Sequence, residues 1–92
     1  MKKAASNKKK SVEFRLQAEP GKNIFLAGTF NNWNPIKMKQ KNKEDDLYTI
    51  TLHLPPGSHE YKFVVDDVWQ IDSKNPETIE NAFGSMNNVV TP

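Results

Sequence analysis

Residues 47–65 read LYTITLHLPPGSHEYKFVV, and this stretch decides the fold. Apolar and polar side chains alternate over Leu47–Leu54, which is typical of a half-buried strand. The Pro55-Pro56-Gly57 turn ends that strand, because proline cannot donate to a strand ladder and glycine favours turns. Alternation then resumes over His59–Val65. The stretch therefore predicts two neighbouring strands joined by a tight turn.

The rest of the chain contains further short strand patterns and no convincing helical period. We expect strands at Ser11–Ala18, Ile24–Ala27, Val68–Ile71 and Asn87–Thr91. Between residues 34 and 46 lysines recur at every second position, which suits an edge strand whose charges discourage pairing with another sheet. Six or seven short strands separated by turn signals predict an all-β antiparallel sandwich.

Length and composition exclude several classes of protein. Ninety-two residues make one small domain, and the absence of cysteine excludes both a disulfide framework and a thiolate metal site. No apolar run is long enough to span a bilayer or to serve as a signal peptide. We therefore expect a soluble, cytoplasmic protein with no membrane partner.

The positive charge is concentrated at the amino terminus. Five of the thirteen basic residues lie within residues 1–10, whereas residues 11–92 carry eight basic and eleven acidic residues, a net charge of −3. We interpret residues 1–10 as a disordered basic tail and residues 11–92 as the folded domain. A nucleic-acid-binding protein carries its positive charge on the folded surface, so we expect no specific nucleic-acid partner.

One tryptophan lies in a predicted loop. Residues 28–35 read GTFNNWNP, which places Trp33 among turn-forming residues immediately after a short strand. Such a side chain either anchors its loop in the core or faces a ligand, and burial is the commoner outcome for a single tryptophan. In the ligand-facing interpretation, Phe30 is the inward anchor and Trp33 is exposed.

The position of the second tryptophan follows from strand pairing. If Asp66-Asp67 form a two-residue hairpin turn, Val64 lies opposite Trp69 and Lys62 lies diagonal to it, roughly 7–8 Å away. The inward face then consists of Tyr61, Phe63, Val65 and Val68, and Trp69 points outward beside a lysine. A longer loop would break this relationship. An aromatic plane with amide and ammonium groups around it suits a sugar ring, a peptide or single-stranded nucleic acid.

Five motifs occur in the order FxL (14–16), FLAGTFNNW (25–33), LxLPxG (52–57), EYKFVVDxxW (60–69) and GxxNNVV (84–90). Together they resemble the glycogen-binding module, carbohydrate-binding module family 48, which occurs in the β subunit of AMP-activated protein kinase and ahead of the catalytic domains of isoamylases and branching enzymes. The likeness extends from about Ser11 to Thr91. It implies an immunoglobulin-like, early-set β-sandwich that binds α-1,4-glucans such as glycogen, starch or cyclodextrins and performs no chemistry.

The resemblance also implies a set of binding residues. In the kinase-subunit branch two tryptophans contact successive glucose units, and they match Trp33 and Trp69. The lysine and the first asparagine of the late pair, which bind sugar hydroxyls, match Lys62 and Asn87. Two further lining positions match Phe83 and Ser85.

This chain departs from the kinase-subunit pattern in three respects. Asp66-Asp67 stands where Asp-Gly is usual, the segment before Gly84 is one residue longer, and Phe83 replaces a smaller leucine.

No pattern indicates catalysis, a metal or a cofactor. Glycoside hydrolysis needs two carboxyl groups about 5–10 Å apart across a cleft, whereas Asp66-Asp67 and Glu44-Asp45-Asp46 read as solvated loop charges. His53 and His59 lack further ligands for a metal. We therefore expect a binding module rather than an enzyme.

Two other functions remain open. The first is a protein-interaction or scaffolding module of a glucan-active enzyme or kinase system, in which sugar binding is vestigial. The second is nucleic-acid binding through the lysine tail and the tryptophans.

Overall fold

A computed structural model describes residues 9–92, which contain nine strands, one turn of 3₁₀ helix at Thr29–Asn31 and no α-helix. The strands are β1 (Lys10–Gln17), β2 (Ile24–Gly28), β3 (Ile36–Lys37), β4 (Lys39–Gln40), β5 (Leu47–Leu54), β6 (His59–Val65), β7 (Val68–Gln70), β8 (Thr78–Glu80) and β9 (Met86–Val90). The predicted basic tail falls on residues that are not described, apart from Lys9 and Lys10, and Lys10 is the first residue of β1.

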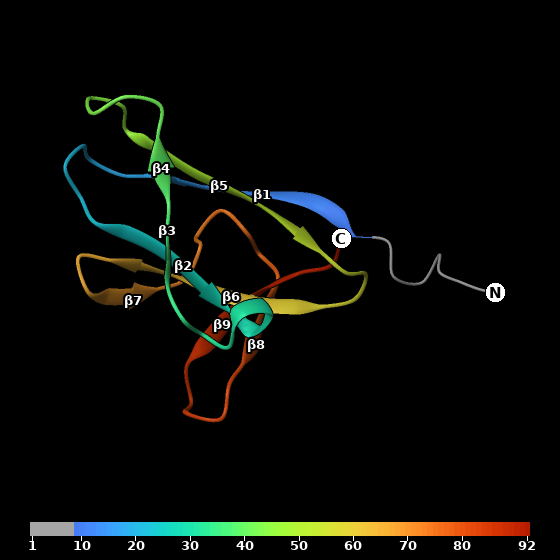
Figure 1. The fold of residues 1–92 in the computed structure, drawn as a ribbon. Coiled ribbons are helices and arrows are strands. Elements are labelled where there is room, and N and C mark those ends of the chain that lie inside the picture. Colours follow the sequence, from blue (N-terminus) through green and yellow to red (C-terminus); the bar gives the residue numbers. More distant parts are fainter. Residues whose placement is uncertain (1–8) are drawn as a thin grey trace.

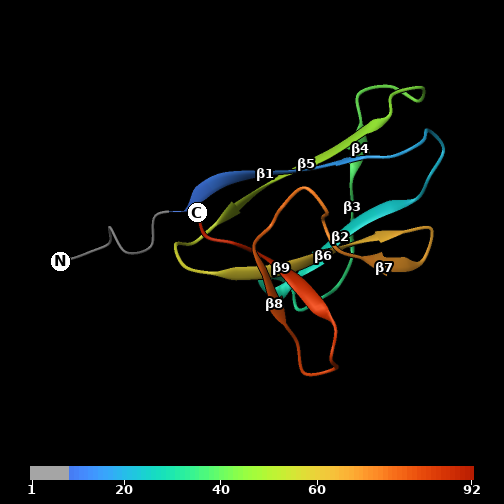
Figure 2. The same ribbon diagram turned by 180° about the vertical axis from the view of Figure 1, so that it is seen from behind.

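The strands form two antiparallel sheets that pack as a sandwich (Figure 1). One sheet has the order β1-β5-β4, and the other has the order β3-β2-β6-β9-β8, with β7 also paired to β6. Figure 2 shows the same two layers from behind, with the loop after β7 rising from the larger sheet toward β1 and β5. The predicted all-β, immunoglobulin-like sandwich is confirmed.

Strand β6 is the centre of the larger sheet. It pairs with β2 along one edge, while β9 and β7 share the other edge: β9 pairs with residues 59–61 and β7 with residues 63–65. Lys62 is the residue of β6 that lies between these two ladders. The strand pairing thus brings β7 and β9 together along one edge of β6, next to Lys62.

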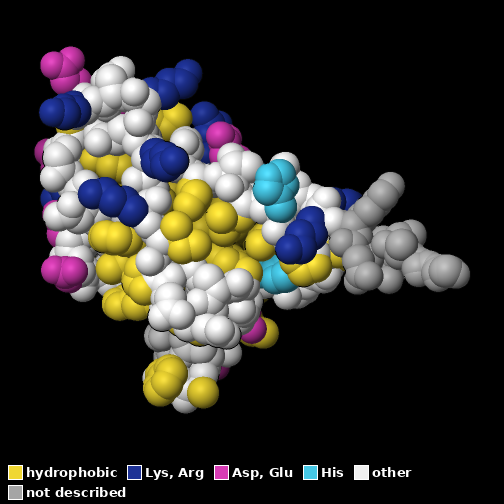
Figure 3. All heavy atoms as spheres, in the orientation of Figure 1, with side chains coloured by type: hydrophobic (Ala, Val, Ile, Leu, Met, Phe, Trp, Pro, Cys, Tyr) yellow, Lys and Arg dark blue, Asp and Glu magenta, His cyan; other side chains and the backbone are white. Residues whose placement is uncertain are grey.

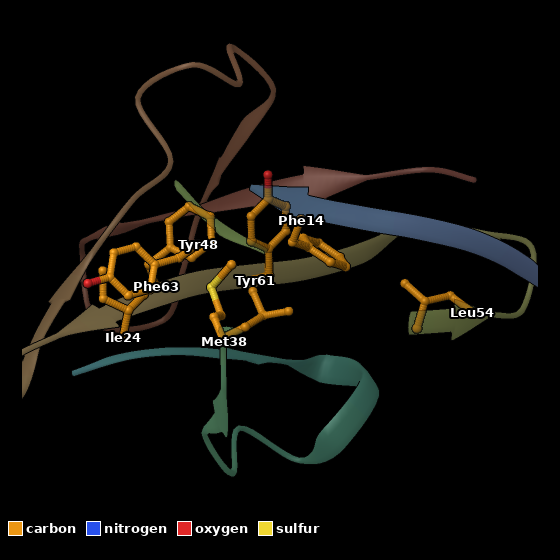
Figure 4. Packing of buried hydrophobic residues seen from close by; sticks show 8 residues of the cluster. Phe14, Ile24, Met38, Tyr48, Leu54, Tyr61 and Phe63 are labelled. Carbon is orange, nitrogen blue, oxygen red and sulfur yellow. The ribbon is translucent and has the colours of Figure 1, made fainter. Parts of the chain in front are cut away.

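The core lies between the two sheets, as Figure 4 shows. Alternate residues of β6 point into it, and Tyr61 and Phe63 are buried there with Phe14 of β1 and Tyr48 of β5. Phe14 and Tyr61 meet edge to face with ring centroids 4.9 Å apart, a favourable aromatic geometry. The alternation predicted for residues 47–54 and 59–65 is confirmed by this burial.

The lysine-rich segment does form edges, but it divides between the sheets. Strand β3 is an edge of the larger sheet, and β4 is an edge of the smaller one. Met38 lies between them and is buried in the core, where its backbone N–H donates to Ile24 O at 2.9 Å. The prediction of one edge strand was therefore wrong in number. The buried Met38 marks the point at which the chain crosses from one sheet to the other.

One strand was not predicted. Thr78–Glu80 forms β8, where the sequence analysis expects no strand, because three exposed residues give no periodic signal. It pairs with β9 to form a hairpin that projects from the sandwich (Figure 1).

A buried polar network holds the loop after β7 against the sheet. Asn88 is completely buried, and its carboxamide donates to Asp72 O and Asn75 O and accepts from the Asp72 backbone N–H. The Tyr61 hydroxyl donates to the Asp72 carboxylate at 3.0 Å and accepts from Asn75. Burial of that hydroxyl, which disfavours its ionised form, raises the pKa of Tyr61 above its ordinary range. These contacts fix the chain between β7 and β8.

Candidate functional site

The loop after β2 holds Trp33 in an uncommon backbone conformation. Asn32 and Trp33 have φ values of 56° and 62°, a region that bulky residues rarely adopt. Asn31 stabilises it by accepting from the Gly28 N–H at 3.0 Å and by exchanging hydrogen bonds with Asn34. The Trp33 N–H donates to Gly28 O at 2.9 Å. The asparagines of the motif therefore build the loop.

Phe30 is the inward anchor of this loop, as predicted, whereas Trp33, which was predicted to be exposed, is partly covered. Phe30 packs against the core, with its ring centroid 5.7 Å from that of Phe14. Trp33 lies at the surface and is half-buried.

The turn that carries Trp69 has the two residues that were predicted. Asp66 and Asp67 have φ values of 48° and 69°, which is the type I′ hairpin geometry. Asp66 Oδ1 accepts from the Asn23 N–H at 2.9 Å and its carboxylate lies 3.3 Å from Lys22 Nζ. The hydrogen bond from Asn23, followed by the lysine, holds the pKa of Asp66 below its ordinary value.

Strand pairing then places Trp69 as expected. Val65 lies opposite Val68 and Val64 opposite Trp69, which is 48% exposed. Val68 is 61% exposed, because it lies beside the turn and pairs with the last residue of β6, so the prediction that it forms part of the inward face was wrong. Val64 and Ala27 are on the same outward face but are buried, so the surface around the tryptophan is partly apolar. The ring centroids of Trp33 and Trp69 are 6.4 Å apart, with 53° between the ring planes. Two aromatic faces at an angle to each other therefore lie side by side.

A cleft of about 580 Å³ extends from the tryptophans to the β8–β9 hairpin. It is lined by all six residues that the sequence analysis singled out: Trp33, Lys62, Trp69, Phe83, Ser85 and Asn87. Phe83 is 95% exposed in the connection of the hairpin, and Figure 3 shows apolar side chains at the tip of this projection. The structure thus brings residues from four distant segments to one surface.

The polar wall of the cleft is continuously hydrogen-bonded. Lys62 Nζ donates to Ser85 Oγ at 3.2 Å, and Asn81 Nδ2 donates to the same oxygen at 2.8 Å. Asn81 Nδ2 also lies 3.1 Å from Asn87 Oδ1, while Asn87 Nδ2 donates to Glu60 Oε1 at 2.9 Å. Asn87 is 5% exposed, so it is more deeply set than the other predicted residues.

Five lining residues were not predicted: Thr29, Glu60, Glu80, Asn81 and Ala82. Strand alternation could have identified Glu60, because it lies two residues before Lys62 and therefore on the same face. Asn81 could not be identified from the sequence, since its position in the cleft depends on the conformation of the connection between β8 and β9. Thr29 Oγ1 accepts from the Glu60 N–H at 3.1 Å and ties the tryptophan loop to β6.

The described residues show no group of three or more metal-ligating side chains. In residues 9–92 no helix is long and apolar enough to cross a membrane. The cytoplasmic location stays a prediction.

Comparison with known proteins identifies the family. The family described as "Glycogen recognition site of AMP-activated protein kinase" matches residues 11–91. The 5'-AMP-activated protein kinase subunit beta-1 of Sus scrofa is 34% identical over 70 residues, covering 76% of this chain and 54% of that protein. Subunit beta-2 of Mus musculus is 38% identical over 73 residues, covering 79% of this chain and 26% of that protein. The chain thus spans about half or a quarter of the length of these relatives.

One solved structure is similar to this chain in its fold. Enterochelin esterase from Shigella flexneri superposes with a TM-score of 0.72 over 97% of this chain and 32% of that one, at 13% sequence identity. This similarity concerns the fold alone, because functions differ widely among proteins that share one architecture. The match over residues 11–91 and the two kinase subunits carry the assignment: the chain belongs to the family of the glycogen recognition site of AMP-activated protein kinase.

Proposed function

We propose that this domain binds α-1,4-linked glucans, such as glycogen, starch chains or cyclodextrins, in the cleft between the tryptophans and the β8–β9 hairpin. One observation carries the proposal: Trp33 and Trp69, 6.4 Å apart, share a cleft with Lys62, Ser85 and Asn87. Membership of a glycogen-recognition family supports it.

The two halves of the cleft match the two kinds of surface on a glucose unit. A pyranose ring has an apolar C–H face, which packs on an aromatic plane, and a rim of hydroxyl groups, which needs donors and acceptors. Trp33 and Trp69 supply the planes, and the 53° between them suits successive sugar faces that turn relative to each other. Lys62, Ser85 and Asn87 supply hydrogen bonds from the facing wall.

Phe83 extends the apolar surface away from the tryptophans. It is almost entirely exposed, on a hairpin that projects from the sandwich. A large apolar side chain so placed contributes binding area when a ligand covers it. We assign it to the far side of the bound glucan.

The proposed role is binding without catalysis. Sugar hydroxyls are well hydrated and each contact is modest, so one domain binds weakly and gains strength where several engage one polymer. The relatives are subunits of a kinase. We therefore propose that the domain brings a kinase or a glucan-active enzyme to its polymer.

Sedimentation with glycogen tests this function. The wild-type protein should co-sediment with glycogen, and soluble maltoheptaose should release it, whereas dextran, which lacks the α-1,4 backbone, should not. The double variant W33A/W69A should stay in the supernatant. Its fold can be verified by its thermal unfolding. Equal sedimentation of the wild type and the double variant would overturn the proposal.

A second candidate function is protein interaction through the lysine-rich edge. Lys37, Lys39, Lys41 and Lys43 are all exposed along β3, β4 and the loop that follows, at the edges of both sheets. Figure 3 shows basic side chains over this part of the surface. A charged edge of this kind suits an acidic protein partner. A pull-down that does not need glucan, survives loss of both tryptophans and fails when the lysines are replaced would support it.

A further inference from the structure

The carboxamide of Asn81 can adopt only one orientation. Its Oδ1 accepts from the backbone N–H groups of Phe83 and Ser85, at 2.9 and 3.1 Å. Backbone N–H groups only donate, so the oxygen must face them and the nitrogen must face the cleft. Both Nδ2 hydrogens are then committed, one to Ser85 Oγ and one to Asn87 Oδ1.

The orientation of the Asn81 carboxamide determines that of the Asn87 carboxamide, which lies next to it in the cleft wall. Asn87 must turn its oxygen toward the donor on Asn81, which directs its nitrogen to Glu60 Oε1 at 2.9 Å. A carboxylate only accepts, so the other end of the chain enforces the same arrangement. The network therefore has one direction, from the backbone of the hairpin through two asparagines to Glu60.

The direction of this network determines how the Ser85 hydroxyl can form hydrogen bonds. Its Oγ accepts from two groups that can only donate to it, Lys62 Nζ and Asn81 Nδ2. A hydroxyl oxygen has two lone pairs, so both are occupied and its own hydrogen remains. Among residues 9–92 no acceptor is recorded for that hydrogen. Ser85 is exposed and lines the cleft, so the hydrogen is available to a ligand.

We infer that Asn81 is a positioning residue that fixes the hydrogen-bonding polarity of the cleft, making Ser85 a donor to the bound glucan and leaving Glu60 as the acceptor. The inference rests on the proposed function and adds a specificity element to it. Ser85 and Lys62 donate to glucan oxygens on one side. On the other side, the free lone pairs of the Glu60 carboxylate receive a sugar hydroxyl.

The variant N81D separates this role from a purely structural one. A carboxylate still accepts from the Phe83 and Ser85 N–H groups, so the hairpin connection is kept. It cannot donate, so Ser85 turns its hydrogen inward and Asn87 loses its donor. We expect β-cyclodextrin affinity, measured by calorimetry, to fall about tenfold, the scale of a lost and mismatched hydrogen bond. N42D is the matched control, because it adds the same charge on a distant loop and keeps its acceptor bond to the Glu44 N–H.

A double-mutant cycle with S85A gives the sharpest test. S85A alone should also weaken β-cyclodextrin binding, by about five- to tenfold, and N81D/S85A should be no weaker than N81D, because the Ser85 donor is already lost. Multiplicative losses, or N81D binding as tightly as N42D, would overturn the inference. If N81D does not fold, S85A decides the matter, since binding equal to that of the wild type would contradict a Ser85 donor.

A measurement without ligand keeps the network distinct from the proposed function. In wild-type protein the side-chain amide hydrogens of Asn81 and Asn87 should exchange slowly with solvent in NMR spectra, and N81D should shift and deprotect those of Asn87. Slow exchange in a protein that fails to bind any glucan would refute the proposed function and leave the network. Fast exchange in the wild type, or Asn87 resonances unmoved in N81D, would refute the network itself.

Discussion

Asn87 and Asn88 are consecutive residues of β9, and their carboxamides serve opposite faces of the same sheet. Asn87 faces the cleft and donates to Glu60 Oε1, whereas Asn88 faces inward and binds the backbone of Asp72 and Asn75. Alternation along a strand produces this division. One asparagine therefore belongs to the site and its neighbour to the fold.

Replacing Asn88 should destabilise the protein. N88A leaves the Asp72 N–H and two carbonyl oxygens without their buried partner, which should lower the free energy of unfolding by about 2–4 kcal/mol. N87A, whose partner Glu60 lines the open cleft, should cost about 1 kcal/mol or less and should instead weaken glucan binding. Urea unfolding of both variants measures the difference. Equal destabilisation would contradict the division of roles.

Adding one methyl group at Gly28 should disturb the base of the tryptophan loop. A Cβ atom there would collide with the backbone carbonyl of Glu60 and would lie 2.6 Å from the Phe30 ring. Because the backbone of β6 cannot yield easily, we expect G28A to lower the free energy of unfolding by about 1–3 kcal/mol. G57A is a useful comparison, since nothing lies near its Cβ position and only its φ of +116° opposes the change. A neutral G28A variant would show that the approach of β2 to β6 is looser than described.

The turn before Trp69 should respond to acid. The pKa of Asp66 is lower in the folded protein, so its carboxylate contributes stability above the unfolded pKa of about 3.9, and this contribution is lost as the pH falls through the folded pKa. D66N cannot ionise. The difference in unfolding free energy between wild type and D66N should therefore narrow as the pH falls below about 4. Urea unfolding over this pH range tests it, and parallel pH profiles would contradict it.

Most of the fold could be predicted because its strands carry strong local patterns. Alternation along the strands predicted that Tyr48, Tyr61 and Phe63 point inward. The two-residue turn then placed Trp69 on the outer face. Strand β8 could not be found, because three exposed residues are held only by pairing with β9.

The candidate site could be predicted only in part from the sequence, for a similar reason. The six predicted residues share one cleft, but the orientation of Asn87 depends on Asn81 and Glu60, which come from separate segments. The division of the lysine-rich segment into β3 and β4 could not be predicted either, because it depends on the burial of Met38 between two sheets that form from distant parts of the chain.

The central claim is that the two tryptophans form the sugar-binding surface. The most direct measurement is tryptophan fluorescence during titration with β-cyclodextrin, up to millimolar concentration, in wild type, W33A and W69A. We expect a saturable change in the wild type and an affinity at least about 30-fold weaker in W69A, which is about 2 kcal/mol, the scale of an aromatic binding hot spot. No saturable change in the wild type, or an unaltered affinity in W69A, would contradict the claim.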